Sequence, residues 1–142
     1  MKRLVFALAF LLAACTTAAN DNDIDVRATV IAEFNVISGP AGRRDWNRFK
    51  ELFAPGAKIV TAGESLTPDE YVTKNKPWFD ANGLFQHPTT MRVERHGDSA
   101  HVIASDESRH ASNDEKPYEQ GATTFDLVRV GEAWKIVTIT RQ

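Results

Sequence analysis

The sequence predicts an α+β domain in which helices pack against one face of a curved antiparallel sheet. Apolar residues recur at helical spacing over roughly the first half of the chain, and from Leu84 onward they alternate with polar residues instead. Two dipeptides typical of tight hairpin turns, Gly97-Asp98 and Gly131-Glu132, divide the second half. We therefore expect three helices followed by long strands joined by hairpins.

The first 14 residues are expected to be a signal peptide, not part of the domain. Lys2 and Arg3 precede an apolar run from Leu4 to Leu12, far shorter than the roughly 20 residues that a transmembrane helix needs. One interpretation is an ordinary secretory signal cut near Ala14. The other is a bacterial lipoprotein signal, because the segment ending in Cys15, Leu-Ala-Ala-Cys, closely resembles a lipobox.

The lipoprotein interpretation sets the expected location and the domain boundaries. Cys15 would carry lipid such as palmitate and anchor the chain in the bacterial cell envelope, at the outer membrane facing the periplasm in a Gram-negative host. Cys15 is the single cysteine, so no intramolecular disulfide competes for its thiol. Residues 15–22 are small and polar and are expected to form a flexible tether, which leaves residues 23–142 as the domain.

The charge balance argues against nucleic acid as a partner. The whole chain carries a formal charge of −2, and loss of Lys2 and Arg3 with the signal peptide makes the mature chain more acidic. A mildly acidic domain without a basic run does not have the electrostatic footprint of a nucleic-acid-binding protein.

The first two helices are expected from their apolar spacing and their end signals. The first covers Ile24 to Ile37 and ends before Gly39-Pro40. The second begins after Asp45 as N-cap and ends at Pro55-Gly56. A short strand over residues 57–62 follows.

The third helix has the strongest local signal. Thr67-Pro68-Asp69-Glu70 is a capping box with proline at the first helical position. The helix then carries Tyr71 and Val72, and we expect an interruption near Pro77.

The second helix also carries a family resemblance. The pattern DWxRFxxLFxPxAxI, which begins at Asp45 and ends at Ile59, resembles the nuclear transport factor 2-like superfamily and its polyketide-cyclase-like bacterial branch. The resemblance implies a cone-shaped sheet around a pocket, with helices at the mouth. Candidate ligand contacts in such a pocket are Trp46, Tyr71 and His87, although Trp46 also fits a position in the core.

The candidate catalytic residues come from pairing the strands. If residues 99–110 and 120–130 pair in even register, Asp106 and Asp126 share one largely apolar face, with His110 and His87 near its far end. A carboxyl group on an apolar face loses hydration, which raises its pKa and suits it to general acid–base work. The alternative is that Asp106 lies at the wet end of the sheet and that Asp126 bonds Lys135 or a helix hydroxyl.

The same register would place Phe125 and Trp134 on the opposite face, among charged residues. A charged rim around an apolar stripe fits solvent contact or a subunit interface. Because members of the resembled superfamily often pair their sheets, a homodimer through the Phe125/Trp134 face is expected as a partner interaction.

Neither a metal nor a cofactor is expected. The four histidines fall on separate strands and turns without the spacing of metal ligands. The sequence has no G-x-S-x-G, G-x-G-x-x-G or P-loop motif.

Three functions remain open from the sequence. The favoured one is a membrane-tethered module that binds a small, largely apolar molecule. The alternatives are an acid–base enzyme of isomerase, dehydratase or cyclase type, and a protein–protein interaction scaffold.

Overall fold

The computed structural model describes residues 19–142. The predictions about the signal peptide and lipidation of Cys15 fall outside these residues. Within them, no helix is both long enough and apolar enough to cross a membrane.

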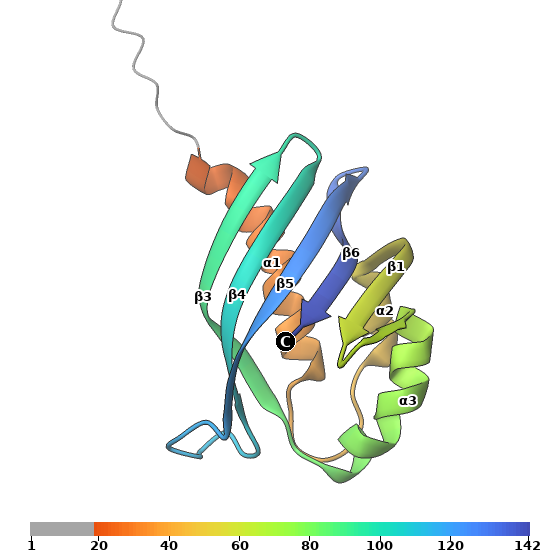
Figure 1. Ribbon diagram of the computed structural model, residues 1–142, viewed down its shortest axis with the longest axis vertical. Helices are drawn as coiled ribbons and strands as arrows, with labels where there is room; N and C mark the ends of the chain where they lie inside the picture. Colours follow the sequence, from red (N-terminus) through yellow and green to blue (C-terminus); the bar gives the residue numbers. More distant parts are fainter. Residues whose placement is uncertain (1–18) are drawn as a thin grey trace, which may run out of the picture.

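Helices and strands follow the expected order, helices first and long strands after (Figure 1). The elements are α1 (Ala19–Ile37), α2 (Trp46–Glu51), β1 (Phe53–Thr61), β2 (Glu64–Leu66), α3 (Pro68–Ala81), β3 (Phe85–His96), β4 (Ser99–Arg109), β5 (Glu119–Val130) and β6 (Ala133–Arg141). The strands form one six-stranded sheet in the order β2-β1-β6-β5-β4-β3. This curved sheet with helices against it confirms the α+β prediction.

Both predicted hairpins are present. Gly97 and Gly131 have φ angles of 61° and 63°, which glycine adopts without the penalty that a side chain would bring. Next to these turns the registers are as expected, with Val93 opposite Val102 and Val128 opposite Lys135. One pairing was not expected: β1 lies parallel to β6, whereas the sequence predicted an antiparallel sheet.

The ends of the helices differ from expectation in two places. Helix α1 begins at Ala19, so the last residues of the expected tether are helical. Helix α3 continues through Pro77 to Ala81, so the predicted interruption is wrong. Pro77 is exposed, and Phe79 beyond it packs against Trp46 with ring centroids 5.2 Å apart, which stabilises the last turn.

The caps of α2 and α3 are as predicted. The backbone N–H of Arg48 donates to Asp45 Oδ1 at 3.0 Å. The N–H of Glu70 donates to Thr67 Oγ1 at 3.1 Å, and the Glu70 carboxylate accepts in return from the Thr67 N–H. Helix α2 is shorter than expected, because the chain turns into β1 at Phe53 and not after Pro55-Gly56.

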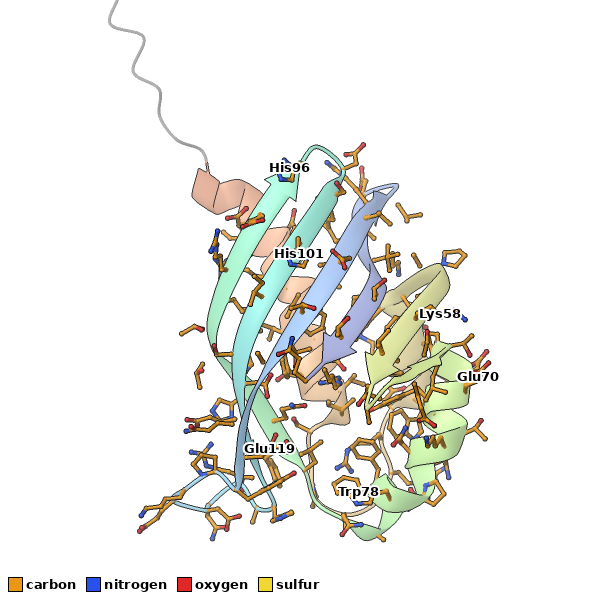
Figure 2. All side chains as sticks on the ribbon, in the orientation of Figure 1. Lys58, Glu70, Trp78, His96, His101 and Glu119 are labelled. Atoms are coloured by element: carbon orange, nitrogen blue, oxygen red, sulfur yellow. The ribbon has the colours of Figure 1, made fainter. Side chains whose placement is uncertain are left out.

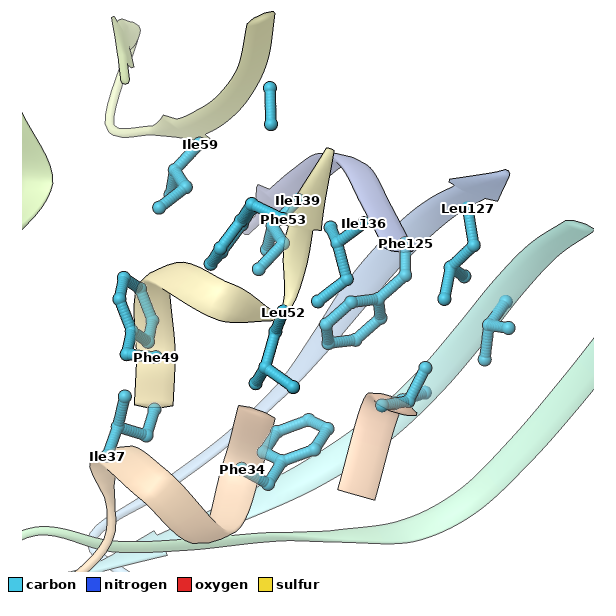
Figure 3. Close-up of a cluster of buried hydrophobic side chains, with 14 of the residues drawn as sticks. Phe34, Ile37, Phe49, Leu52, Phe53, Ile59, Phe125, Leu127, Ile136 and Ile139 are labelled. Carbon is cyan, nitrogen blue, oxygen red and sulfur yellow. The ribbon is translucent and has the colours of Figure 1, made fainter. Parts of the chain in front are cut away.

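The hydrophobic core lies between α1 and the inner face of the sheet (Figure 3). Phe34 of α1 is fully buried and meets Phe125 of β5 edge-on, with ring centroids 5.7 Å apart. Phe49 of α2 closes the core at the side, between Phe53 and Tyr71. The apolar stripe predicted for the first helix therefore does cover the sheet.

The register between β4 and β5 is not the expected one. Val102 lies opposite Phe125 and Asp106 opposite Gly121, so every β5 side chain points to the face opposite to that predicted. A bulge between Asp126 and Leu127 then shifts the pairing with β6.

The corrected register moves the expected interface residues into the core. Phe125 is 0% exposed and Trp134 5% exposed, so the Phe125/Trp134 face is covered within the chain and cannot centre a dimer or a scaffold surface. Val130, which the even register would place on the inner face, is exposed instead. The homodimer itself stays a prediction.

Candidate functional site

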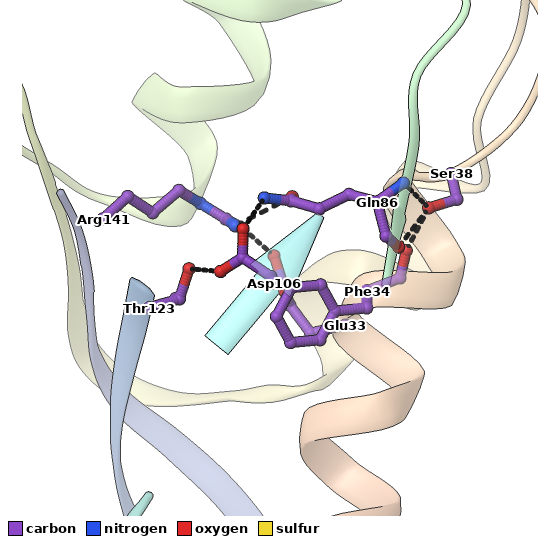
Figure 4. A network of polar contacts seen from close by, with 7 residues as sticks. All are labelled: Glu33, Phe34, Ser38, Gln86, Asp106, Thr123 and Arg141. Carbon is purple, nitrogen blue, oxygen red and sulfur yellow. Dashed lines mark hydrogen bonds and ion pairs between the residues drawn. The ribbon is translucent and has the colours of Figure 1, made fainter. Parts of the chain in front are cut away.

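A buried polar network lies between α1 and the inner face of the sheet (Figure 4). Glu33 of α1 is 0% exposed, Asp106 of β4 is 5% exposed and Thr123 of β5 is 1% exposed. Gln86 of β3 and Arg141 of β6 complete the group. Four strands and one helix thus each contribute one side chain to the network.

Hydrogen bonds join the five side chains of this buried polar network in a continuous chain. Gln86 Nε2 donates to Asp106 Oδ1 at 3.0 Å, and Thr123 Oγ1 donates to Asp106 Oδ2 at 2.8 Å. Arg141 Nη1 donates to Gln86 Oε1 at 3.2 Å, while Arg141 Nη2 pairs with Glu33 Oε1. Gln86 can bridge Asp106 and Arg141 because its amide offers both a donor and an acceptor.

The network is tied to the end of α1 through the backbone of Gln86. Ser38 Oγ accepts from the Gln86 N–H at 3.0 Å, directly after the last residue of the helix. Nearby, Gly83 approaches the β4 end so closely that a Cβ atom would lie 2.4 Å from the carbonyl oxygen of His110. Glycine is therefore required there for β3 to start beside β4.

Two atoms of the network have no hydrogen-bond partner among the described residues. They are Glu33 Oε2 and Arg141 Nε, and both are buried. Burial raises the pKa of Glu33 above its ordinary value, and Arg141 offsets this only in part. The Glu33 carboxyl is therefore easier to protonate than an exposed glutamate, although it faces a guanidinium.

Two adjoining cavities open beside this network, and we call them together the mouth. Their volumes are about 200 Å³ and about 360 Å³, and Gln86, Glu119 and Arg141 line both. The smaller cavity is bounded by helix α3, which contributes Tyr71. The larger runs along β5 past Asp106 and Thr123.

Gly121 keeps one side of the Asp106 carboxylate open. It lies opposite Asp106 in the sheet, and a Cβ atom at this position would stand 3.5 Å from Asp106 Oδ1. Both residues line the larger cavity. A ligand in that cavity could thus reach the carboxylate without displacing a side chain.

Asp106 and Tyr71 lie in the mouth, as candidate site residues were expected to. Tyr71 is 7% exposed, and its ring stacks on Phe49 with centroids 5.5 Å apart. Burial raises the pKa of the Tyr71 hydroxyl, Glu33 adds to the rise and Arg141 opposes it.

Asp126 does not share the site, and the prediction that it points into one cavity with Asp106 is wrong. Its side chain is 54% exposed on the opposite face of the sheet, with Asp126 Oδ1 2.7 Å from His101 Nδ1. The physical reason is the odd register between β4 and β5. The suggested bond from Asp126 to Lys135 is replaced by this contact with His101.

The two candidate histidines lie near the mouth but not in its lining. His110 stacks on Tyr118, with ring centroids 3.9 Å apart and planes 6° apart, and Tyr118 lines the smaller cavity. His87 points to the outer face, where its Nε2 lies 3.7 Å from Glu107 Oε2. His110 therefore supports a wall of the mouth, and His87 takes no part in it.

Trp46 lies outside the mouth. It packs edge-on against Phe49 and Phe79 at the side of the core and borders a separate surface cavity of about 220 Å³ beside Arg44. Its Nε1 atom is buried without a partner among the described residues. The structure thus places Trp46 with the core side chains, the alternative weighed for it in the sequence.

Sequence reasoning missed Glu33, Gln86, Thr123 and Arg141. Glu33 carried a usable signal, because it lies three residues after Val30 and four before Ile37, within the apolar stripe of α1. An acidic residue on that stripe predicts a buried carboxyl that needs a partner. Across residues 19–142, no group of three or more His, Cys, Asp or Glu side chains has an arrangement that could hold a metal ion.

Residues 41–140 match the SnoaL-like domain, so the chain belongs to this family. No curated protein has a sequence that matches the chain. The matched residues cover α2, α3, the strands β1 to β5 and all of β6 except Arg141, and hence most of the mouth.

Solved structures confirm the fold. A Nostoc punctiforme protein of unknown function with a cystatin-like fold is 10% identical, with a TM-score of 0.72 over 88% of this chain and 91% of that one. A candidate scytalone dehydratase from Novosphingobium aromaticivorans is 14% identical, with a TM-score of 0.70 over 87% and 85%. A candidate ketosteroid isomerase from Shewanella frigidimarina is 15% identical, with a TM-score of 0.58 over 89% and 96%. At these identities the likeness speaks to fold alone, the nuclear transport factor 2-like cone.

Proposed function

We propose that the chain binds a small organic molecule in the mouth of the cone. One observation carries the proposal: a hydrogen-bonded network with two acids and one guanidinium is buried directly beside two open cavities. The ligand would have an apolar body, which rests on Tyr71 and Phe79, and a polar group that reaches Asp106 or Arg141.

The energetic cost of the network supports a function for it. Charged groups that leave water lose several kcal/mol of hydration each, and well-packed apolar residues in their place are often as stable or more stable. A fold that needed only stability would fill this end of the cone with apolar side chains. Ionisable groups that are buried at a cavity are instead typical of binding and catalytic sites.

Chemical-shift mapping with a small-molecule library tests the binding proposal. We expect a ligand to shift the amide resonances of Gln86, Asp106 and Gly121 together, and Asp106→Asn to weaken that ligand. Glu115→Gln is the matched control, because Glu115 is an exposed acid in the loop before β5 and does not line the mouth. Ligands that bind only elsewhere, or equally well to both variants, would overturn the proposal.

An acid–base enzyme is the second candidate, and the setting of Asp106 favours it. Hydrogen bonds from Gln86 and Thr123 fix both carboxylate oxygens, and Gly121 leaves one side of the group open to the cavity. A carboxylate held in this way can accept a proton from a bound substrate. The names of the similar dehydratase and isomerase structures agree with such chemistry.

Turnover separates the two candidates. A ligand found by shift mapping would be converted by an enzyme, and Asp106→Asn would abolish conversion while binding survives in part. A ligand that is recovered unchanged after long incubation with the protein would favour the binding module.

We also propose that the domain is tethered to a membrane through lipid on Cys15, as the lipobox-like segment suggests. The mouth would then face the periplasm in a Gram-negative host. Labelling of cells with an alkyne fatty acid should mark the wild-type chain but not Cys15→Ser, which should move to the soluble fraction. A mature chain that carries no label would refute the tether and leave the binding proposal intact.

A further inference from the structure

Two exposed aromatic side chains flank the smaller cavity of the mouth. Trp78 of α3 is 42% exposed and Tyr118, just before β5, is 48% exposed. Both line the same cavity of about 200 Å³, although they come from segments far apart in the sequence. Figure 2 shows Trp78 and Glu119 at the same end of the molecule.

Each of the two rings packs against a neighbouring aromatic side chain, which restricts its orientation. Trp78 meets Phe79 edge-on, with ring centroids 5.2 Å apart. Tyr118 stacks on His110, and its backbone N–H donates to the Ser108 carbonyl oxygen at 2.9 Å. Large aromatic surfaces that are fixed and left in solvent at a cavity are typical of a ligand site.

The lining of the mouth and the network behind it contain more acids than bases. Glu33, Asp106 and Glu119 contribute three carboxyl groups, and Arg141 contributes the single guanidinium among the described residues there. Arg141 is already paired with Glu33. Glu119 forms no ion pair with any described residue, and Lys116 lies on an adjoining surface cavity outside the mouth.

One polar group in the smaller cavity is also without a partner. Tyr71 is more than nine-tenths buried, and its hydroxyl makes no hydrogen bond to any residue in the described part of the chain. The hydroxyl oxygen itself is not fully enclosed, so a polar group of a ligand in the cavity can form a hydrogen bond with it.

We propose that the mouth recognises a small organic cation, of the alkylammonium class, with a hydroxyl or other polar group at its far end. The inference rests on the proposed binding function and names its ligand class. The cation would lie against the faces of Trp78 and Tyr118, where the ring quadrupole attracts positive charge. Glu119 supplies the opposite charge at the rim, and the Tyr71 hydroxyl meets the polar end of the ligand.

Three matched probes test the charge of the ligand by calorimetry. They are choline, its uncharged carbon analogue 3,3-dimethyl-1-butanol, and the anion 3,3-dimethylbutanoate, which share nearly the same shape. We expect choline to bind at least about tenfold more tightly than the alcohol, and the anion to bind most weakly. Equal or tighter binding of the alcohol or the anion would overturn the cation inference.

Variants locate the interaction. Trp78→Leu keeps an apolar surface but removes the ring, and Glu119→Gln keeps the shape but removes the charge. Each should weaken choline severalfold and leave the alcohol unchanged, whereas the control Glu115→Gln should leave choline unchanged. Unchanged choline binding in Glu119→Gln would overturn the inference whether or not Trp78→Leu folds, because Glu119 is exposed and its substitution should not disturb the fold.

Different experimental results would refute the cation inference and the broader binding proposal. If none of the three probes binds while an uncharged molecule shifts the Gln86 and Asp106 amides, the cation inference is wrong and the mouth is still a binding site. If no molecule of any charge shifts those amides, both are wrong.

Discussion

Glu33 of α1 pairs with Arg141 at the end of β6, so a buried ion pair joins the first helix to the last strand. The two residues are 108 positions apart, and Glu33 is fully buried. Only Glu33 Oε1 has a partner among the described residues, while Oε2 has none. The pair therefore holds the open end of the cone together, but its carboxyl is incompletely satisfied.

The first prediction concerns the pH dependence that Glu33 brings. Burial raises the pKa of Glu33 in the folded chain above the value of 4.5 expected for the unfolded chain. The folded state then binds this proton more tightly, so the stabilisation is complete below about pH 4.5 and is lost as pH rises through the folded pKa. The free energy of unfolding of the wild type should thus fall, relative to Glu33→Gln, as pH increases above 4.5.

Urea unfolding of both proteins between pH 4 and pH 8 measures this difference. Glu33→Gln keeps the shape of the side chain and a hydrogen-bond acceptor for Arg141. Should the wild type instead gain stability relative to the variant as pH rises, the ion pair outweighs burial and the folded pKa of Glu33 is lowered.

The sequence predicted most of the fold because its signals are local. The capping box at Thr67, the N-cap at Asp45 and the two glycine turns each depend on residues within four positions of one another. The register between β4 and β5 depends on the long loop between them, for which no turn rule exists. Because side chains alternate between faces, an error of one residue there moved Asp126 and Phe125 to the wrong faces together.

The second prediction compares Asp106 with Asp126, which the corrected register separates. Asp106→Asn gives up one acceptor of a buried carboxylate that receives hydrogen bonds from Gln86 and Thr123, so it should destabilise the fold by about 1–3 kcal/mol. Asp126→Asn changes an exposed side chain and should stay within about 0.5 kcal/mol. Chemical denaturation at pH 7 gives both values, and equal losses would contradict the assignment of Asp126 to the outer face.

The third prediction separates Phe49 from Trp46. Phe49 is fully buried and contacts the rings of Trp46, Phe53 and Tyr71, so Phe49→Ala should cost about 3–5 kcal/mol. Trp46 is only partly buried, and Trp46→Ala should cost less than Phe49→Ala. Reversible denaturation of both variants ranks them, and a larger loss for Trp46→Ala would make Trp46 the main closure of this side of the core.

The polar network was harder to foresee than the core. The periodic spacing of apolar residues in the sequence identifies the core. Gln86, Thr123 and Arg141, by contrast, are ordinary polar residues in strands that also expose polar side chains. They differ from other polar residues only because their side chains meet Asp106 and Glu33 in the folded chain. That meeting depends on the curvature of the sheet and on the strand register, which the sequence does not show directly. Asp106 was predicted from the pairing of the strands, and its place on the inner face does not depend on the wrong register, because Val102 and Ala104 precede it at alternate positions of the same strand.

The last prediction uses the fact that Tyr71 and Tyr118 are the two tyrosines of the chain. In Tyr118→Phe, absorbance near 295 nm reports the ionisation of Tyr71 alone. Burial raises the pKa of the Tyr71 hydroxyl above its ordinary value of 10.0, so less than half of the folded protein should be ionised at Tyr71 at pH 10. Since the unfolded chain ionises there, the stabilisation from Tyr71 is complete below pH 10 and is lost as pH rises through the folded pKa. In the folded protein, the ionisation of Tyr71 should therefore be centred above pH 10, and the free energy of unfolding should fall relative to Tyr71→Phe as pH rises from 10. A gradual ionisation of Tyr71 centred at or below pH 10 in the folded protein would show that its hydroxyl is hydrated, and the mouth would then be more open than the structure indicates.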